Sequence, residues 1–226
     1  MPQQSPARPA AAKRRGRPGY DQQSVLEIAV EVFNERGFEA TSMGALADSL
    51  GISKSAIYHH VASKGDLLRL ALDRALDGLE GVLADPGASE GPAVDRLEHV
   101  LRRTVEVMVQ ELPYVTLLLR LRGNTEVERD AMTRRRTFTA RVTKLVRMAG
   151  AEGSMRSDID PGTTSRLLFG TINSIVDWYR PGGAITAQKL ADDLISMSFD
   201  GLRLPAAARV PRIPRVPERV GTSSGH

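Results

Sequence analysis

Apolar residues recur at helical spacing along most of the chain, and no other pattern interrupts them for long. The first such segment places its apolar side chains on one face of a helix: Val25, Ile28, Ala29, Val32 and Phe33. No segment alternates apolar and polar residues in the way that predicts a half-buried strand. The sequence therefore predicts an all-α protein of about nine helices.

Capping residues and helix breakers set the expected helix boundaries. Four helices are predicted before residue 84, with N-caps at Asp21, at Thr41 or Ser42, at Ser53 and at Ser63. The prolines and glycines of residues 85–92 predict a loop. Five more helices are predicted at about residues 93–112, 113–122, 126–149, 161–179 and 187–203, the last two capped by Asp160 and Thr186.

Composition narrows the classes of protein that the chain can belong to. The absence of cysteine excludes a disulfide framework and a cysteine nucleophile. Neither a signal peptide nor a run of about 20 apolar residues is found, so a cytoplasmic protein with no membrane partner is expected. The adjacent His59 and His60 would point to different faces of a helix. No metal site, cofactor or enzymatic activity is therefore predicted.

Residues 41–61 contain two short predicted helices joined at Gly51. Because glycine adopts positive φ without strain, the second helix can leave at a steep angle, as in a helix-turn-helix. The second helix of such a unit enters the major groove of DNA. The candidates for DNA contact are Thr41, Ser42, Ser53, Lys54, Ser55, Tyr58, His59, His60 and Lys64. The alternative is a plain three-helix core with ordinary surface residues.

Charge is unevenly distributed along the chain. The formal net charge is +4, but residues 1–19 carry basic residues and no acid, and residues 205–226 are also basic. The body between them is therefore mildly acidic. Arg14, Arg15 and Arg17 surround Gly16, and such a segment beside a DNA-reading unit predicts contact with a narrow minor groove. The alternative is a solvated, solubilising tail.

Residues 22–68 resemble the DNA-binding domain of TetR/AcrR-family regulators. The resemblance rests on the helix-turn-helix and on the segment from Ile57 to Leu68, which reads Ile-Tyr-His-His-Val-Ala-Ser-Lys-Gly-Asp-Leu-Leu. Val61 replaces the phenylalanine usual in the family, a change that should not disturb the fold. The resemblance implies a homodimer on a palindromic double-stranded DNA operator, released when a small molecule binds the C-terminal half.

The second half is expected to hold that effector between amphipathic helices. The candidate lining residues are Met108, Tyr114, Leu117, Leu118, Arg120, Arg122, Asn124, Phe138, Phe169, Ile172 and Trp178. An apolar stripe at helical spacing is more often plain core. The run Arg134–Arg136 suggests a charged mouth for the cleft, or else a solvated helix face paired with Glu126, Glu128 and Asp130.

Two C-terminal segments resemble TetR-type regulators of aromatic-acid, steroid or fatty-acid breakdown. They are Trp178–Gly183 and the Arg-x-Asp-x-Asp-Pro sequence at residues 156–161. The resemblance implies an acyl-CoA effector, and phenylacetyl-CoA of a phenylacetate-catabolism repressor is the specific expectation. Alternatives are another apolar effector, such as a drug or lipid, and an effector-independent DNA-binding protein.

The expected organisation has four parts. A disordered basic arm (1–19) precedes a helix-turn-helix domain (20–68), an effector-binding and dimerisation domain (69–204) and a disordered Pro/Arg-rich tail (205–226) without an assigned role. The last two helices are predicted to form the homodimer interface. Its candidate residues are Gly170, Ile175, Leu190, Leu194, Ile195 and Phe199.

Overall fold

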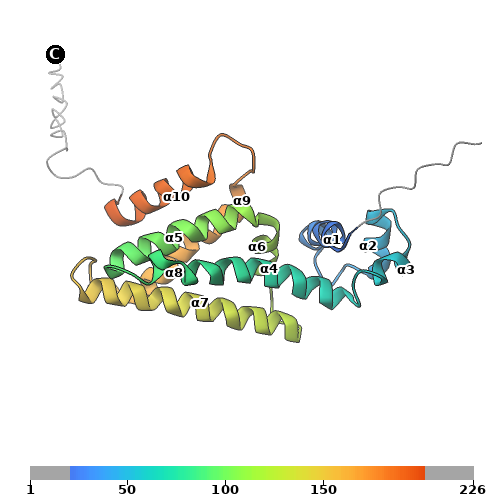
Figure 1. Ribbon diagram of the computed structural model, residues 1–226, viewed down its shortest axis with the longest axis horizontal. Helices are drawn as coiled ribbons and strands as arrows, with labels where there is room; N and C mark the ends of the chain where they lie inside the picture. The colour runs from blue at the N-terminus through green and yellow to red at the C-terminus, as the bar shows by residue number, and fades with distance from the viewer. Residues whose placement is uncertain (1–20, 202–226) are drawn as a thin grey trace, which may run out of the picture.

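The computed structural model describes residues 21–201, which fold into ten α-helices with no strand (Figure 1). The all-α prediction is confirmed. The helices are α1 (Gln22–Arg36), α2 (Met43–Leu50), α3 (Lys54–Tyr58), α4 (Lys64–Ala84), α5 (Ala93–Gln110), α6 (Leu112–Leu119), α7 (Glu126–Ala151), α8 (Pro161–Asn173), α9 (Ile175–Trp178) and α10 (Ala187–Ile195).

Two C-terminal helices differ from the predicted boundaries. The helix expected over residues 161–179 breaks at Ser174, which separates α8 from the single-turn α9. The last helix, expected to reach about residue 203, ends at Ile195 and continues as one π turn over Ser196–Asp200. Neither break follows a proline or glycine, so no breaker signal in the sequence marked it.

Side-chain caps form at the predicted helix starts. A side chain accepts a backbone N–H of the first turn at Asp21, Ser53, Ser63, Asp160 and Thr186. At the ambiguous start of α2, the cap is Ser42 and not Thr41. Each such cap stabilises a helix by about 1 kcal/mol, which matters most for the five-residue α3.

Helices α1, α2 and α3 form a small unit at one end of the molecule (Figure 1). Helix α1 packs on α2 and α4, and α2 packs on α3. The largest fully buried side chains of this unit are Phe33, Leu46, Leu50 and Ile57. One contiguous apolar core therefore fixes the angle between the two short helices.

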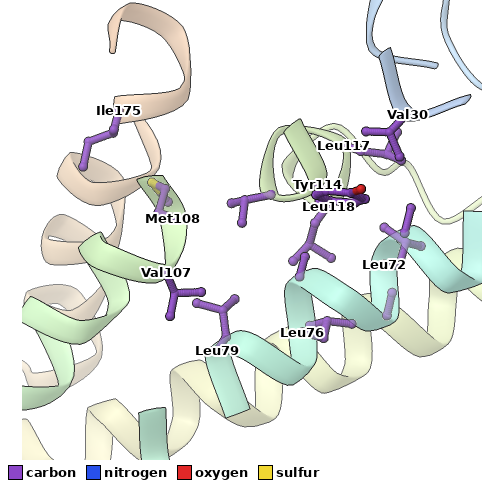
Figure 2. Packing of buried hydrophobic residues seen from close by; sticks show 14 of the residues in the cluster. Val30, Leu72, Leu76, Leu79, Val107, Met108, Tyr114, Leu117, Leu118 and Ile175 are labelled. Atoms are coloured by element: carbon purple, nitrogen blue, oxygen red, sulfur yellow. The ribbon is translucent and has the colours of Figure 1, made fainter. Parts of the chain in front are cut away.

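Helix α4 joins this unit to the rest of the molecule, because it packs on α1 as well as on α5, α6 and α7. The domain boundary expected at residue 68 falls inside α4. Its buried stripe runs through Leu68, Leu72, Leu76 and Leu79, and Figure 2 shows the last three beneath α6. Replacing one such leucine by alanine typically removes about 2–5 kcal/mol of stability.

The second half is a bundle in which α5 packs on α4, α7 and α10, and α7 packs on α8. Val107 and Met108 of α5 lie toward α4 and α9 in Figure 2. No helix within residues 21–201 is long and apolar enough to cross a membrane.

Most residues expected to face a second copy instead fill the core of the single chain. Leu190, Leu194 and Ile195 are buried where α10 packs on α5, and Ile175 is buried as well. For these four residues the assignment was wrong, because they pack within the monomer, whereas Gly170 is exposed. The large apolar side chains exposed in this region are instead Leu167, Trp178, Ile185 and Met197.

Candidate DNA-binding and effector sites

The turn between α2 and α3 depends on Gly51, which has φ 64° and ψ 31°. This left-handed conformation is one that residues with a Cβ rarely adopt. The backbone N–H of Ile52 donates to the carbonyl of Ala47 at 3.1 Å, which closes the end of α2. Ser53 then caps α3 by accepting the Ala56 N–H at 3.1 Å.

Helix α3 presents a polar face to solvent. Ile57 is fully buried and anchors the helix, while Lys54, Ser55 and His59 are exposed and Tyr58 is 46% exposed. His60 is half-buried, and its carbonyl accepts a hydrogen bond from Nε2 of Gln22 at 3.1 Å. The structure thus brings the predicted DNA-contacting residues of this helix together on one surface.

Two of the predicted DNA contacts lie differently from expectation. Thr41 is 2% exposed, and its Oγ1 donates to the carbonyl of Gly37 at 2.8 Å, so the side chain holds the α1–α2 turn and does not face outward. Lys64 Nζ donates to the Phe38 carbonyl at 2.8 Å and lies 4.2 Å from the Phe38 ring centroid. Ser42, by contrast, is exposed at the start of α2.

The predicted arm contacts Arg14, Arg15 and Arg17 lie outside the described residues. The first described residue, Asp21, caps α1, and the Ser24 hydrogen bonds keep the pKa of its carboxyl below the usual value. Through the bond from Gln22 to His60, the start of α1 lies beside the end of α3. The described part of the chain therefore begins close to the end of α3.

A cavity of about 260 Å³ lies among α4, α5, α6, α7 and α8. Four predicted effector residues line it, namely Met108, Leu118, Phe138 and Phe169. The ring centroids of Phe138 and Phe169 are 5.8 Å apart. The opening is thus lined by an aromatic pair and aliphatic side chains, the surface that an apolar group requires.

Of the run Arg134–Arg136, which the sequence suggested as a charged mouth, Arg135 lines this cavity, and so does Arg166, for which the sequence gave no signal. Arg135 is half-buried, and among residues 21–201 its one hydrogen bond runs from Nη1 to the Leu118 carbonyl, at 3.4 Å. Burial first, and then the neighbouring Arg136, lowers the pKa of Arg135. A cation in this environment favours an anionic or strongly polar oxygen as its partner.

The three consecutive arginines point in three directions. Arg134 pairs with Asp73, Asp77 and Glu80 of α4, at 2.8, 2.6 and 2.8 Å, which ties α7 to α4. Arg135 faces the cavity and Arg136 is exposed. The alternative, pairing with Glu126, Glu128 and Asp130, is not found among the described residues, because Arg134 binds the acids of α4 and Glu128 accepts the backbone N–H groups of Asn124 and Thr125.

The remaining effector candidates are not brought to this cavity. Leu117, Arg120, Arg122 and Asn124 line a separate cleft of about 590 Å³ beside α1. Tyr114, Ile172 and Trp178 line neither. The Tyr114 hydroxyl accepts from Nη1 of Arg74 at 3.2 Å, Ile172 is fully buried in the core, and Trp178 is 48% exposed. The single cleft expected from the sequence is therefore wrong, since its parts lie on opposite sides of α6.

Comparisons with known proteins agree with this architecture. Residues 25–71 match the family model described as "Bacterial regulatory proteins, tetR family", and residues 90–202 match "Tetracyclin repressor-like, C-terminal domain". The chain is 32% identical over 189 residues to the HTH-type transcriptional repressor KstR2 of Rhodococcus jostii (strain RHA1), covering 80% of this chain and 90% of the relative.

Solved structures show the same fold. The TetR-family member SCO3833 from Streptomyces coelicolor A3 has a TM-score of 0.77 and 51% identity, covering 80% of this chain and 91% of the other. AibR, solved in complex with isovaleryl coenzyme A and operator DNA, has a TM-score of 0.67 at 23% identity, with 79% and 97% covered. The likeness to AibR shows the fold alone. From the two family matches and these relatives, the chain belongs to the TetR family of helix-turn-helix, DNA-binding transcriptional regulators.

Proposed function

We propose that this protein represses transcription in the cytoplasm as a homodimer on a palindromic operator and leaves it when an acyl-CoA thioester binds. The observation that carries the proposal is the polar face of α3, held outward by the buried Ile57. On a two-fold symmetric dimer, two such helices fit successive major grooves about 34–36 Å apart.

The exposed side chains of α3 are the proposed readers of the operator. Lys54, Ser55, Tyr58 and His59 all carry hydrogen-bonding groups and are exposed. Ser42 and Ser53 lie at helix starts, where backbone N–H groups favour a phosphate. The arm residues Arg14, Arg15 and Arg17 are proposed to enter the adjacent minor groove.

The effector proposal rests on the cavity beside Arg135. Its volume of about 260 Å³ lies just below the about 300–1,000 Å³ typical of whole-ligand pockets, so it suits the acyl part of a larger molecule. The Phe138 and Phe169 rings favour an aromatic acyl group, which makes phenylacetyl-CoA the preferred effector. Arg135 and Arg166 are positioned to donate hydrogen bonds to the thioester oxygen or to a phosphate.

Dimerisation is assigned to the outer side of α8 to α10. Leu167 is 64% exposed, and Trp178, Ile185 and Met197 are also exposed, although each is a large apolar residue. Gly170 on α8 is exposed and has no atom within 4 Å of an added Cβ, so a second helix can approach closely there. We propose domain limits of 20–68 and 69–204, with α4 crossing between the two domains.

Helix α4 is the proposed link between effector and operator. Leu79 near its end lines the cavity, whereas Leu67 near its start is buried in the DNA-binding unit. Arg74 of α4 also binds Glu111 through Nε at 2.6 Å and Nη2 at 3.2 Å. An effector releases DNA in this scheme only if it binds better to the form of the dimer that fits the operator less well.

The test is a titration of the full chain onto DNA that spans its own promoter. Phenylacetyl-CoA, long-chain acyl-CoAs and the matching free acids are added in parallel. A discrete complex that one thioester dissolves, and its free acid does not, supports the proposal and identifies the effector. A discrete complex that resists every thioester overturns the acyl-CoA assignment while leaving operator binding intact.

A further inference from the structure

A second cleft, of about 590 Å³, lies between the two halves of the molecule. Its walls come from the end of α1 with the α1–α2 turn and from the end of α6 with the segment that leads into α7. Leu117 lines this cleft, while the next residue, Leu118, lines the cavity beside Arg135. Figure 2 shows Leu117 against Val30 of α1. Helix α6 thus separates two openings, and only one has been given an occupant.

The cleft is rich in arginine. Arg36 comes from α1, and Arg120 and Arg122 follow α6. Within residues 21–201, neither Arg36 nor Arg122 has a carboxylate within 4.0 Å, and both are exposed. Of the two lining acids, Glu128 is buried and accepts the backbone N–H groups of Asn124 and Thr125, while Glu39 is exposed. The three lining arginines outnumber these two acids, so the cleft has a net positive charge that favours an anion.

Asn34 adds a hydrogen-bond acceptor to the same wall. Its Nδ2 donates to the Pro113 carbonyl at 2.8 Å. This bond fixes the orientation of the amide, because the reverse orientation would place Oδ1 against the Pro113 carbonyl, and both oxygens are acceptors. Its Oδ1 is buried and accepts no hydrogen bond from the described residues. A ligand N–H or O–H group satisfies this oxygen only if the wall opens slightly on binding, because the atom has almost no accessible surface.

An aromatic surface completes the cleft. Phe33 and Phe38 both line it, with ring centroids 5.2 Å apart and the rings nearly perpendicular. Phe38 is only half-buried, so part of its side chain is available to a planar apolar group. Arginines recognise phosphate, an unsatisfied acceptor recognises a hydroxyl or amine, and an aromatic side chain recognises a base. The cleft contains all three kinds of group.

We propose that this cleft binds a phosphorylated nucleoside. Its phosphates lie on Arg36 and Arg122, its base packs on Phe38, and a hydroxyl or amine donates to Asn34. The nucleotide end of a coenzyme A thioester and a separate nucleotide share this chemistry. Only the first source rests on the effector proposed above.

Such a ligand would be coupled to operator binding. It contacts Arg36 of the DNA-binding unit and Arg122 of the effector half at the same time. Asn34 is hydrogen-bonded to both ends of α6. Its side chain donates to the Pro113 carbonyl at the start of α6, and Nη1 of Arg120 at the end donates to the Asn34 carbonyl at 2.8 Å. A nucleotide that favours one relative position of the halves changes operator affinity, and the operator changes nucleotide affinity by the same factor.

The test is calorimetric titration of the full chain with ADP, coenzyme A without an acyl group, adenosine and inorganic phosphate. We expect ADP and coenzyme A to bind, and adenosine to bind at least about tenfold more weakly because it lacks the charge-assisted bonds. Arg36→Gln and Arg122→Gln should each weaken ADP binding about tenfold. Arg147→Gln, at an exposed arginine of α7 outside the cleft, is the matched control and should bind like the wild type.

The outcomes separate this site from the effector cavity. If ADP fails to bind at millimolar concentration, or binds equally to all three variants, the proposal is overturned. If Arg122→Gln weakens thioester binding as well as ADP binding, the nucleotide end of the thioester is the occupant. If Arg122→Gln weakens only ADP binding, a separate nucleotide is the occupant. In another outcome, a thioester still releases the operator from Arg122→Gln while ADP does not bind to the wild type. This result overturns the nucleotide site and leaves the effector assignment intact.

Discussion

The DNA-binding unit and the effector cavity are built in opposite ways. The surface proposed to contact DNA comes from one five-residue helix, α3. The N-cap, the buried anchor and the exposed face of this helix all lie between Ser53 and His59. The effector cavity takes its walls from five helices between Leu79 and Asn173. A local surface can change its side chains without losing its shape, whereas a cavity enclosed by distant segments changes when any of its walls moves.

The sharpest test of this contrast uses two adjacent residues of α3, beginning with the buried one. Ile57→Ala removes a fully buried side chain and should lower the free energy of unfolding by about 2–5 kcal/mol. Urea denaturation followed by circular dichroism measures the change. Surface substitutions usually change the unfolding free energy by no more than about 0.5 kcal/mol. A change this small in Ile57→Ala would mean that Ile57 does not anchor α3.

Tyr58→Ala, one residue further on, should have the reverse effect. Tyr58 is 46% exposed, so stability should hardly change, while operator affinity should fall by about 1–3 kcal/mol if the side chain contacts a base or phosphate. Fluorescence anisotropy with labelled operator measures the affinity. Gln188→Ala, an exposed polar position on α10, is the control that should bind as the wild type does. Equal affinity of all three proteins would remove Tyr58 from the interface.

Arg135→Gln should affect the effector half alone. The half-buried guanidinium contacts only the Leu118 carbonyl among the described residues, so its loss should leave stability and operator affinity nearly unchanged. The thioester concentration needed to release the operator should rise about tenfold, as expected for one lost charge-assisted hydrogen bond. Arg136→Gln, the exposed neighbour, is the matched control. An unchanged release concentration in Arg135→Gln would argue against Arg135 as an effector contact.

Arg134→Gln tests the connection between α4 and α7 and should have a small effect. Its ion pairs are partly exposed, so we expect a loss of about 0.5–1 kcal/mol in unfolding free energy. Its hydrogen bond lowers the pKa of Glu80, so this contribution is present above the ordinary carboxylate pKa and is lost as pH falls through the lowered value. The stability difference between variant and wild type should therefore shrink on acidification. A difference that is constant from neutral pH to strong acid would contradict the pairing.

The sequence predicted what local chemistry determines. Ser53 and Ser63 stand at helix starts because their hydroxyls cap backbone N–H groups, and that signal is contained in four consecutive residues. Gly51 marked the turn because its φ of 64° is unfavourable for other residues. These few signals were enough to place the exposed face of α3.

What the sequence did not predict depends on which distant helices meet. Arg134, Arg135 and Arg136 are chemically identical, yet only the packing of α4, α5 and α8 against α7 decides which one faces the cavity. Thr41 and Ser42 were equally good caps, and the burial of Thr41 decided between them. Leu117 and Leu118 are neighbours that line different openings, which becomes visible only once α1 and α4 lie on opposite sides of α6.

Operator recognition by the exposed face of α3 is tested most directly by footprinting the full chain on DNA upstream of its own gene. We predict one protected palindrome, with half-sites about one helical turn (~34–36 Å) apart or slightly more, and loss of protection when salt is raised. Uniform protection of all DNA in the lane, or no protection in moderate salt, would contradict sequence-specific repression by this protein.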